Sequence, residues 1–249
     1  FTLTVNAVND APILDLVSNQ GIDEDSSIEI ELSAYDVDGD DLTYSVNVDD
    51  NAIASISNNF LTIIPDQNYN GNIIISVAVS DGQYLDTQDF VLIVESVNDA
   101  PIITSIEDQN IDEDTDLSLI LLSADVDGDA LTYSVIADDN CSASIVDNIL
   151  SVVPNINYNG NIDIDVSVSD GEYSDTDSFI VIVNEVNDIP ILTFIEDLSI
   201  DENTELELTL LGSDVDGDTL TYSASVDGNA NVNVVDNTST LMPDLNYNG

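Results

Sequence analysis

The chain has 249 residues, of which 51 are Asp or Glu and none is Lys, Arg or His, so its formal net charge is −51 at pH 7. This argues against duplex nucleic acid or an anionic membrane surface as a partner, because binding to either needs positive charge. A disordered acidic tail is also disfavoured, since 43% of the residues are apolar and the acids are interspersed among them.

In chain order, apolar residues alternate with a period of two, which predicts strands. Residues 1–5 share the alternation of residues 90–94, so residues 1–9 are expected to be the last strand of a preceding repeat. The following unit predicts about seven strands, at residues 12–16, 28–34, 42–46, 73–79 and 90–94, with two more within 53–64. The expected fold is all-β: an immunoglobulin-like antiparallel sandwich with almost no helix.

Three motifs recur at a constant step of 89 residues. Asn-Asp-x-Pro begins at Asn9, Asn98 and Asn187, Asp-Val-Asp-Gly-Asp begins at Asp36, Asp125 and Asp214, and Asn-Tyr-Asn-Gly begins at Asn68, Asn157 and Asn246. The step predicts tandem domains at residues 10–98, 99–187 and 188–249, the last without its final two strands. The single Cys141 aligns with Ala52 and Ala230 in this register, which indicates a small-residue position and no intrachain disulfide.

The charge has two explanations at this point: divalent cations that offset the repulsion, or an acidic surface adapted to a saline habitat. The composition also excludes several classes of catalysis. Ser-His and Cys-His mechanisms need His, and Schiff-base chemistry needs Lys, and the chain has neither residue. A carboxylate pair can hydrolyse glycosides, but acids repeated in every unit indicate structural metal ligands. We therefore expect no enzyme. The sequence contains neither a signal peptide nor an 18-residue apolar span.

Acids stand in four places in each unit, all in loops or linkers. For the first unit these are the triplet around Glu24, the Asp36–Asp40 turn, the Ser-Asp-Gly turn at Asp81 and, in the linker to the next unit, Asp99. Calcium accepts six to eight oxygens in flexible geometry, so separate loops can share one ion, whereas magnesium is stricter. An EF-hand is excluded, because glycine is fourth in the turn and the twelfth position is Asn47. Turn chemistry alone is the competing interpretation of the turn.

The run Ile200-Asp201-Glu202-Asn203 and the run Leu211–Ser223, which contains Ser213-Asp214-Val215-Asp216-Gly217-Asp218, resemble the cadherin repeat. With Asn-Asp-Ala-Pro and Asn-Tyr-Asn-Gly added, the chain is most similar to the cadherin-like tandem repeats of large bacterial calcium-dependent surface adhesins. The resemblance covers essentially the whole chain. It implies bound Ca²⁺ at each junction between successive domains.

The resemblance also implies the ligands. For the first complete junction they are Glu24, Asn98, Asp99, Asp125, Asp127 and Asp170. For the second they are Glu113, Asn187, Asp188, Asp214 and Asp216. A further site at the N-terminal end would use Asn9, Asp10, Asp36, Asp38 and Asp81, and is expected to be weaker because its donor repeat is truncated.

The chain departs from the cadherin pattern in two ways. The Asp-Arg-Glu element is missing, with Pro65-Asp66-Gln67-Asn68 standing roughly in its place, and the linker is one Asn shorter. The aspartate after the glycine (Asp40, Asp129 and Asp218) fits either a ligand or a turn cap.

The expected function is a calcium-rigidified stalk of a secreted or surface-anchored adhesin, with calcium ions and neighbouring repeats as its partners. One alternative is a direct adhesion module that binds like molecules or surface glycans. It is disfavoured because the chain has no Trp and no loop insertion in any copy. Accessory repeats of a large secreted enzyme are the other alternative. In each case the expected location is extracellular or at the cell surface.

Overall fold

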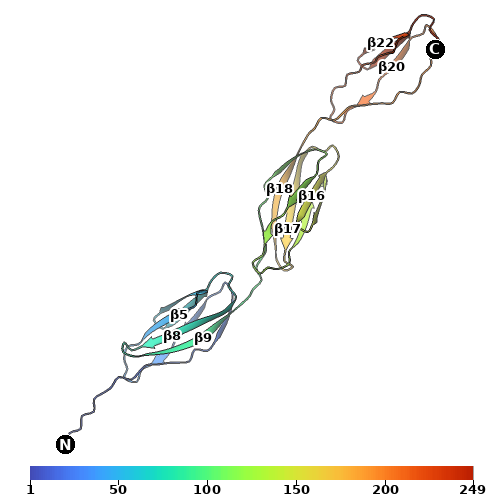
Figure 1. The fold of residues 1–249 in the computed structure, drawn as a ribbon. Helices are drawn as coiled ribbons and strands as arrows, with labels where there is room; N and C mark the ends of the chain where they lie inside the picture. Colours follow the sequence, from blue (N-terminus) through green and yellow to red (C-terminus); the bar gives the residue numbers. More distant parts are fainter. Residues whose placement is uncertain (249) are drawn as a thin grey trace. The chain divides into compact units, whose positions relative to one another are not determined.

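The computed structural model describes residues 1–248, and within that range the regular secondary structure consists of strands, without helices (Figure 1). The described residues accordingly include no helix that could cross a membrane. The chain divides into two compact units. Unit 1 comprises residues 1–102, 124–131 and 169–174, and unit 2 comprises residues 103–123, 132–168 and 175–249. Two loops of the second repeat therefore belong to unit 1.

The first repeat forms nine strands that make two sheets and a short strand pair. The strands are β1 (Ile13–Leu14), β2 (Gln20–Asp23), β3 (Ile28–Glu31), β4 (Ala34–Tyr35), β5 (Thr43–Val48), β6 (Ala52–Ser57), β7 (Phe60–Pro65), β8 (Gly71–Ser80) and β9 (Leu85–Glu95). One sheet has the order β2-β9-β8-β5, the other has the order β3-β7-β6, and β1 pairs with β4. Figure 1 shows β5, β8 and β9 side by side in the first of these sheets.

The second repeat has the same strand orders, β11-β18-β17-β14 and β12-β16-β15, with the pair β10-β13. Its strands are β10 (Ile102–Ile103), β11 (Gln109–Asp112), β12 (Leu117–Ile120), β13 (Ser123–Ala124), β14 (Thr132–Ala137), β15 (Cys141–Val146), β16 (Ile149–Pro154), β17 (Gly160–Ser169) and β18 (Ser174–Asn184). The alternation along β8 shows why the sandwich forms, since Ile73, Ile75, Val77 and Val79 are fully buried. The same positions of β17 are buried in the second repeat.

Beyond residue 190 the structure has fewer strands. They are β19 (Ile191–Leu192), β20 (Leu206–Thr209), β21 (Gly212–Ser213), β22 (Ala230–Val235) and β23 (Thr238–Pro243). These form the sheet β20-β23-β22 and the pair β19-β21. Leu210 is buried, but Ile191 and Phe194 are largely exposed because no second sheet covers them within the described residues.

The all-β expectation is confirmed, with three differences in detail. Residues 1–9 form no strand, because a strand needs a ladder partner and residues 1–9 have none in the chain. The single strand expected at 28–34 is divided between β3 and β4. The structure adds β2, which pairs in parallel with the end of β9, from Gln20 opposite Leu92 to Asp23 opposite Glu95. Because β2 has a single large apolar residue, Ile22, the alternation could not reveal it.

Candidate metal centre

The added strand β2 places a glutamate at the end of the first sandwich. After β2, the Glu24 N–H donates to the Glu95 carbonyl at 2.9 Å. The Glu24 side chain is buried, with 6% of its surface exposed, and its Oε1 accepts a 2.6 Å hydrogen bond from the backbone N–H of Val97. The glutamate is thereby fixed against the linker that leaves β9.

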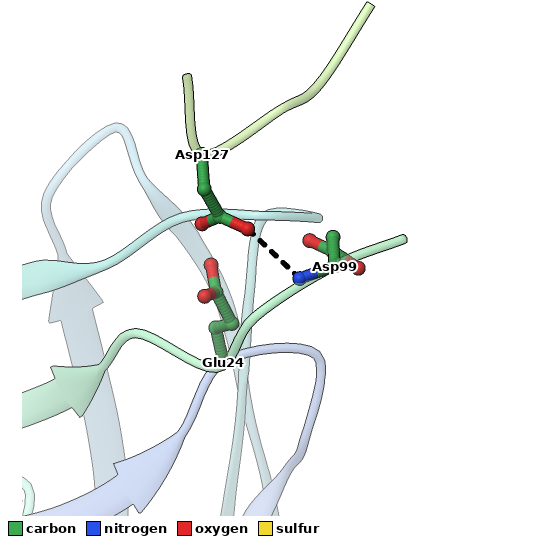
Figure 2. Close-up of side chains that lie close together, drawn as sticks. All are labelled: Glu24, Asp99 and Asp127. Atoms are coloured by element: carbon green, nitrogen blue, oxygen red, sulfur yellow. Dashed lines mark hydrogen bonds between the residues drawn. The ribbon is translucent and has the colours of Figure 1, made fainter. Parts of the chain in front are cut away.

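The linker residues bring further oxygens to Glu24. The Asp99 N–H donates to Oδ2 of Asp127 at 2.8 Å, so the linker is held by the Asp-Val-Asp-Gly-Asp loop. In Figure 2 the carboxylates of Glu24, Asp99 and Asp127 face one another, and one oxygen from each lies within 4.8 Å of the others. All three residues belong to unit 1, although they come from three separate segments.

The loop itself uses one carboxylate oxygen for the turn and leaves the other bare. Oδ1 of Asp125 accepts hydrogen bonds from the N–H groups of Asp127, Gly128 and Asp129 at 3.0, 3.0 and 3.2 Å. Oδ2 of Asp125 is buried and has no partner. Oxygens of Asp125, Asp127 and Asp129 also lie within 4.8 Å of one another. The turn therefore accounts for Oδ1 of Asp125 but not for the buried Oδ2.

The Ser-Asp-Gly turn is joined to the same linker. Asn98 Nδ2 donates to Oδ2 of Asp170 at 2.8 Å, while Oδ1 of Asp170 accepts the N–H groups of Glu172 and Tyr173 at 2.6 and 2.7 Å. The Asn98 amide is the first cause of the lowered pKa of Asp170, and these backbone donors add to it. The structure thus brings together all six residues expected at the first junction.

Unit 2 repeats the arrangement with the second set of residues. Glu113, 4% exposed, accepts the Val186 N–H on Oε1 at 2.5 Å, and its Oε2 is buried without a partner. The Asp188 N–H donates to Oδ2 of Asp216 at 2.6 Å. Oδ1 of Asp214 accepts the Asp216 N–H at 3.1 Å. Asn187 Nδ2 donates to the Asp188 carbonyl at 2.8 Å, as Asn98 Nδ2 does to the Asp99 carbonyl, and the position equivalent to Asp170 would fall beyond residue 249.

The N-terminal set is also assembled, without a glutamate. Asn9 Nδ2 donates to Oδ2 of Asp81 at 2.8 Å, and the Asp10 N–H donates to Oδ2 of Asp38 at 2.8 Å. Oδ1 of Asp36 accepts the Asp38 N–H at 2.8 Å, and its Oδ2 is buried and unpartnered. Hydrogen bonds from the N–H groups of Tyr84 and Gln83 lower the pKa of Asp81.

The electrostatics of these sites are those of an anion cluster without a counter-charge, because the chain has no Lys, Arg or His. The pKa of Asp99 is raised, first by desolvation and then by the charges of Asp127, Asp25, Glu24 and Asp125. In unit 2 the pKa of Asp188 is raised by desolvation, then by Asp216, Asp114, Glu113 and Asp214.

Buried side-chain oxygens without a hydrogen-bond partner gather at the same places. Among the described residues they belong to Asp36, Asn68, Asp99, Glu113, Asp125 and Asp188. An unsatisfied buried acceptor costs about 1–3 kcal/mol, more if charged. Five of the six are carboxylate oxygens of residues expected to hold calcium, so the donor set fits a hard cation with oxygen ligands.

Two further residues lie beside the first junction that the sequence pattern did not indicate. Asp25 contributes to the raised pKa of Asp99, and its Oδ1 accepts the Asn68 N–H at 3.0 Å. Asn68 lies in the turn after β7 with a φ of 57°, and its side-chain oxygen is buried without a hydrogen-bond partner. The sequence did offer a signal for Asn68, because Pro65–Asn68 stands roughly where the cadherin Asp-Arg-Glu element is missing.

Comparison with known families agrees with the repeat pattern. Residues 97–184 match the family described as cadherin-like domain, and residues 9–93 match the family described as bacterial Ig domain. The resemblance to bacterial cadherin-like repeats is confirmed at the level of these domains.

A curated protein and two solved structures are similar over parts of their lengths. Chitinase A of Pseudoalteromonas piscicida is 32% identical over 108 residues, which are 42% of this chain and 13% of the chitinase. Human protocadherin-24 EC1-2 is 14% identical, covering 71% of this chain and 100% of that chain, with a TM-score of 0.44. An endo-fucoidan hydrolase of glycoside hydrolase family 107 is 18% identical, covering 96% of this chain and 40% of that chain, with a TM-score of 0.33.

Proposed function

Because the chain contains cadherin-like and bacterial Ig domains, we propose that it is a calcium-binding, calcium-rigidified extracellular repeat module with a structural role. The observation that carries the proposal is the set of bare, buried carboxylate oxygens at the ends of the repeats. Glu113 is the sharpest case, since it is 4% exposed, holds the linker through Oε1 and leaves Oε2 without a partner.

Each site would hold its ion with residues from two successive repeats. At the first junction the ligand-bearing residues would be Glu24, Asn98, Asp99, Asp125, Asp127 and Asp170. At the second they would be Glu113, Asn187, Asp188, Asp214 and Asp216. A bound divalent cation supplies the positive charge that the chain lacks, and calcium suits ligands drawn from separate loops. The described hydrogen bonds already position the linkers, so binding would require little rearrangement of the carboxylates.

The consequence for the molecule would be mechanical. With the ion bound, each linker is tied to the carboxylates on both of its sides, and successive repeats keep one relative orientation. Without it, like charges repel at each junction. We assign this stiffness to a stalk of a secreted or surface-anchored adhesin, in which the repeats provide reach and do not themselves catalyse a reaction.

The chitinase match favours a second candidate, accessory repeats of a large secreted enzyme. The matched segment makes up 13% of that chitinase, so the same kind of repeat occurs in a protein with a catalytic name. Calcium-dependent stiffness would serve as a spacer there too. The two candidates differ in what the repeats are attached to, which the sequence of the complete parent protein would decide.

The experiment is a calcium titration of the 249-residue chain, followed by small-angle scattering and calorimetry. With a dissociation constant of about 0.1 mM, in the range of extracellular calcium modules, 10 mM calcium is about 100 times the dissociation constant. At this concentration, calcium binding at each site would raise the free energy of unfolding by about 2.7 kcal/mol. The expected result is a melting temperature higher by about 10 °C. The distribution of molecular dimensions derived from scattering should also become narrower, because fewer orientations of the repeats are populated. If neither quantity moves at 10 mM calcium, the proposal is wrong.

A direct adhesion role is tested separately. Calcium-loaded chain on coated beads would aggregate them if like molecules bind one another, and a glycan array would reveal carbohydrate binding. The stalk proposal expects neither.

A further inference from the structure

We infer that the outer face of the sheet β12-β16-β15, in the second repeat, is a contact surface for the same face of a second copy of this chain. The stalk proposal by itself expects no contact between copies, so the inference goes beyond it, and it does not depend on calcium binding. It starts from three strands without a single acid in a chain whose net charge is −51.

The outer face carries a row of aliphatic side chains that crosses all three strands. The strand register places Ile120 of β12 opposite Ile149 of β16, and Ile149 opposite Val146 of β15. These side chains are 68%, 46% and 70% exposed, in that order. The rest of the face consists of small polar side chains and one valine: Ser118, Ser151 and Ser144 in the next row, then Val153 opposite Ser142. An exposed aliphatic row bordered by polar side chains is typical of an interaction surface.

The lack of charge is specific to this sheet. Within residues 1–248, every other three- or four-stranded sheet exposes at least one acid on its outer face: Glu29 and Glu31 on β3, Asp89 on β9, Asp163 on β17 and Glu207 on β20. At the 89-residue step, Glu29 and Glu31 align with Ser118 and Ile120. The fold does not require this difference, since the three-stranded sheets have the same order in both repeats.

The charge of the molecule indicates the occupant. Two chains of net charge −51 repel each other wherever acidic surfaces meet, whereas two faces without acids can pack without that cost. A basic partner, which the field of the chain would attract, finds no ion pair on this face. In a two-fold contact the same face is used twice. The row of one copy then packs on the row of the other, at the usual distance of about 10 Å between packed sheets.

The size of the face predicts a weak contact. Three strands about 4.8 Å apart, with at most six residues that each rise about 3.4 Å, present roughly 300 Å². A standard stable interface buries about 800 Å² per partner. We therefore expect a dissociation constant of about 0.1–1 mM for free chains. The contact becomes effective where many chains stand side by side on one surface.

The test is sedimentation equilibrium of the full chain from about 0.02 to 1 mM in 0.5 M NaCl, where the screening length is about 4 Å. The series is run in a chelator and in 10 mM calcium. The variant is Ile120→Glu, which places a glutamate where the first repeat has Glu31. The matched control is Ile53→Glu on the equivalent face of the first repeat, because Ile53 is 69% exposed. Thermal melting reports whether each variant is folded.

The expected result is a mean mass that rises towards twice the monomer mass in the unmutated chain and in Ile53→Glu, in both buffers. In Ile120→Glu the dissociation constant should be at least about tenfold higher, since two glutamates would then face each other across the contact. Lowering NaCl to about 0.15 M should weaken the association, because repulsion between the chains is screened less.

Three outcomes would overturn the inference. If the unmutated chain stays monomeric at every concentration, the face is not a contact between copies and a partner of different sequence would have to cover it. Equal weakening by Ile53→Glu would assign the effect to added charge in general. Association in calcium alone would place the contact at the junctions, and would leave the calcium proposal intact.

Discussion

Junction carboxylates in this chain divide their two oxygens between different tasks. Oε1 of Glu113 and Oδ1 of Asp125 accept backbone N–H groups, while their second oxygens are buried without partners. The first contact fixes the side chain, so the second oxygen is presented in a defined position. A turn or a cap alone would need one oxygen, and the bare one is what distinguishes a ligand.

At the same scale, Asp99→Asn should change stability in opposite directions with and without calcium. The raised pKa of Asp99 means that its charged form is disfavoured in the folded protein, by desolvation and by neighbouring acids. The neutral amide should therefore raise the calcium-free melting temperature by about 2–4 °C, and lower it in 10 mM calcium because a charged ligand is lost. Calorimetry in both buffers measures this.

The control for that prediction is Asp50→Asn, which removes one charge from an exposed position in the turn after β5. Since Asp50 lies outside the junction residues, the calcium effect should be that of the unmutated protein. A uniform shift of Asp99→Asn in both buffers would contradict the assignment.

The pH dependence of the calcium-free protein follows from the same raised pKa values. Asp99 and Asp188 have folded-state pKa values above the ordinary 3.8, so each destabilises the fold when ionised and binds its proton more tightly when folded. Stability should rise as pH falls from 7 through these raised pKa values towards 3.8. The double variant Asp99→Asn, Asp188→Asn should show a smaller rise in thermal melts between pH 7 and 4.5. An equal rise would show that general charge repulsion is responsible.

At the scale of elements, the short parallel pairs β2-β9 and β11-β18 place the glutamates. In the second repeat the pair runs from Gln109 opposite Val181 to Asp112 opposite Asn184, and the Glu113 N–H continues it to the Asn184 carbonyl at 2.9 Å. Because this ladder ends where the linker begins, the following glutamate is buried against the linker. The same ladder in the first repeat does this for Glu24.

The Asn-Tyr-Asn-Gly loop offers a prediction about Gly71. Its φ is 137°, and a Cβ there would lie 3.0 Å from the hydroxyl oxygen of Tyr69, which donates to the Asn72 carbonyl. Gly71→Ala should destabilise the first repeat by about 1–3 kcal/mol, because the conformation is strained for an L-residue and the contact is tight. Urea denaturation measures it. Gly21→Ala is the control, since the nearest atom to its Cβ is 3.9 Å away and a near-neutral effect is expected.

Sequence patterns revealed those elements that repeat or alternate. The long strands β8 and β9 follow from alternation, and the clustering of Glu24, Asp99 and Asp127 follows from the resemblance to cadherin repeats. Strand β2 escaped because a short parallel edge strand depends on its partner and not on an apolar face of its own. The buried, unpartnered amide oxygen of Asn68 could not be predicted, because the burial of one oxygen is set by the surrounding loops.

At the scale of the whole molecule, a net charge of −51 disfavours every compact state. The charges fall into two groups with different physics. Most Asp and Glu are exposed, and salt screens exposed charges over about 10 Å at 0.1 M. Four junction carboxylates, those of Asp99, Glu113, Asp125 and Asp188, each have one buried oxygen without a hydrogen-bond partner, and salt screens buried charges less. Adaptation to a saline habitat would explain the first group and leave the second without a reason.

The two groups can be separated by comparing sodium with calcium. Added NaCl should raise the melting temperature gradually through screening, in the unmutated chain and in the triple variant Asp38→Asn, Asp127→Asn, Asp216→Asn alike. Calcium at 10 mM should exceed the effect of about 30 mM NaCl, which has the same ionic strength, in the unmutated chain only. Each substitution keeps the turn, because the backbone N–H groups bond the preceding aspartate, Asp125 in the second repeat. If both salts act equally at matched ionic strength, screening alone explains the acidic composition.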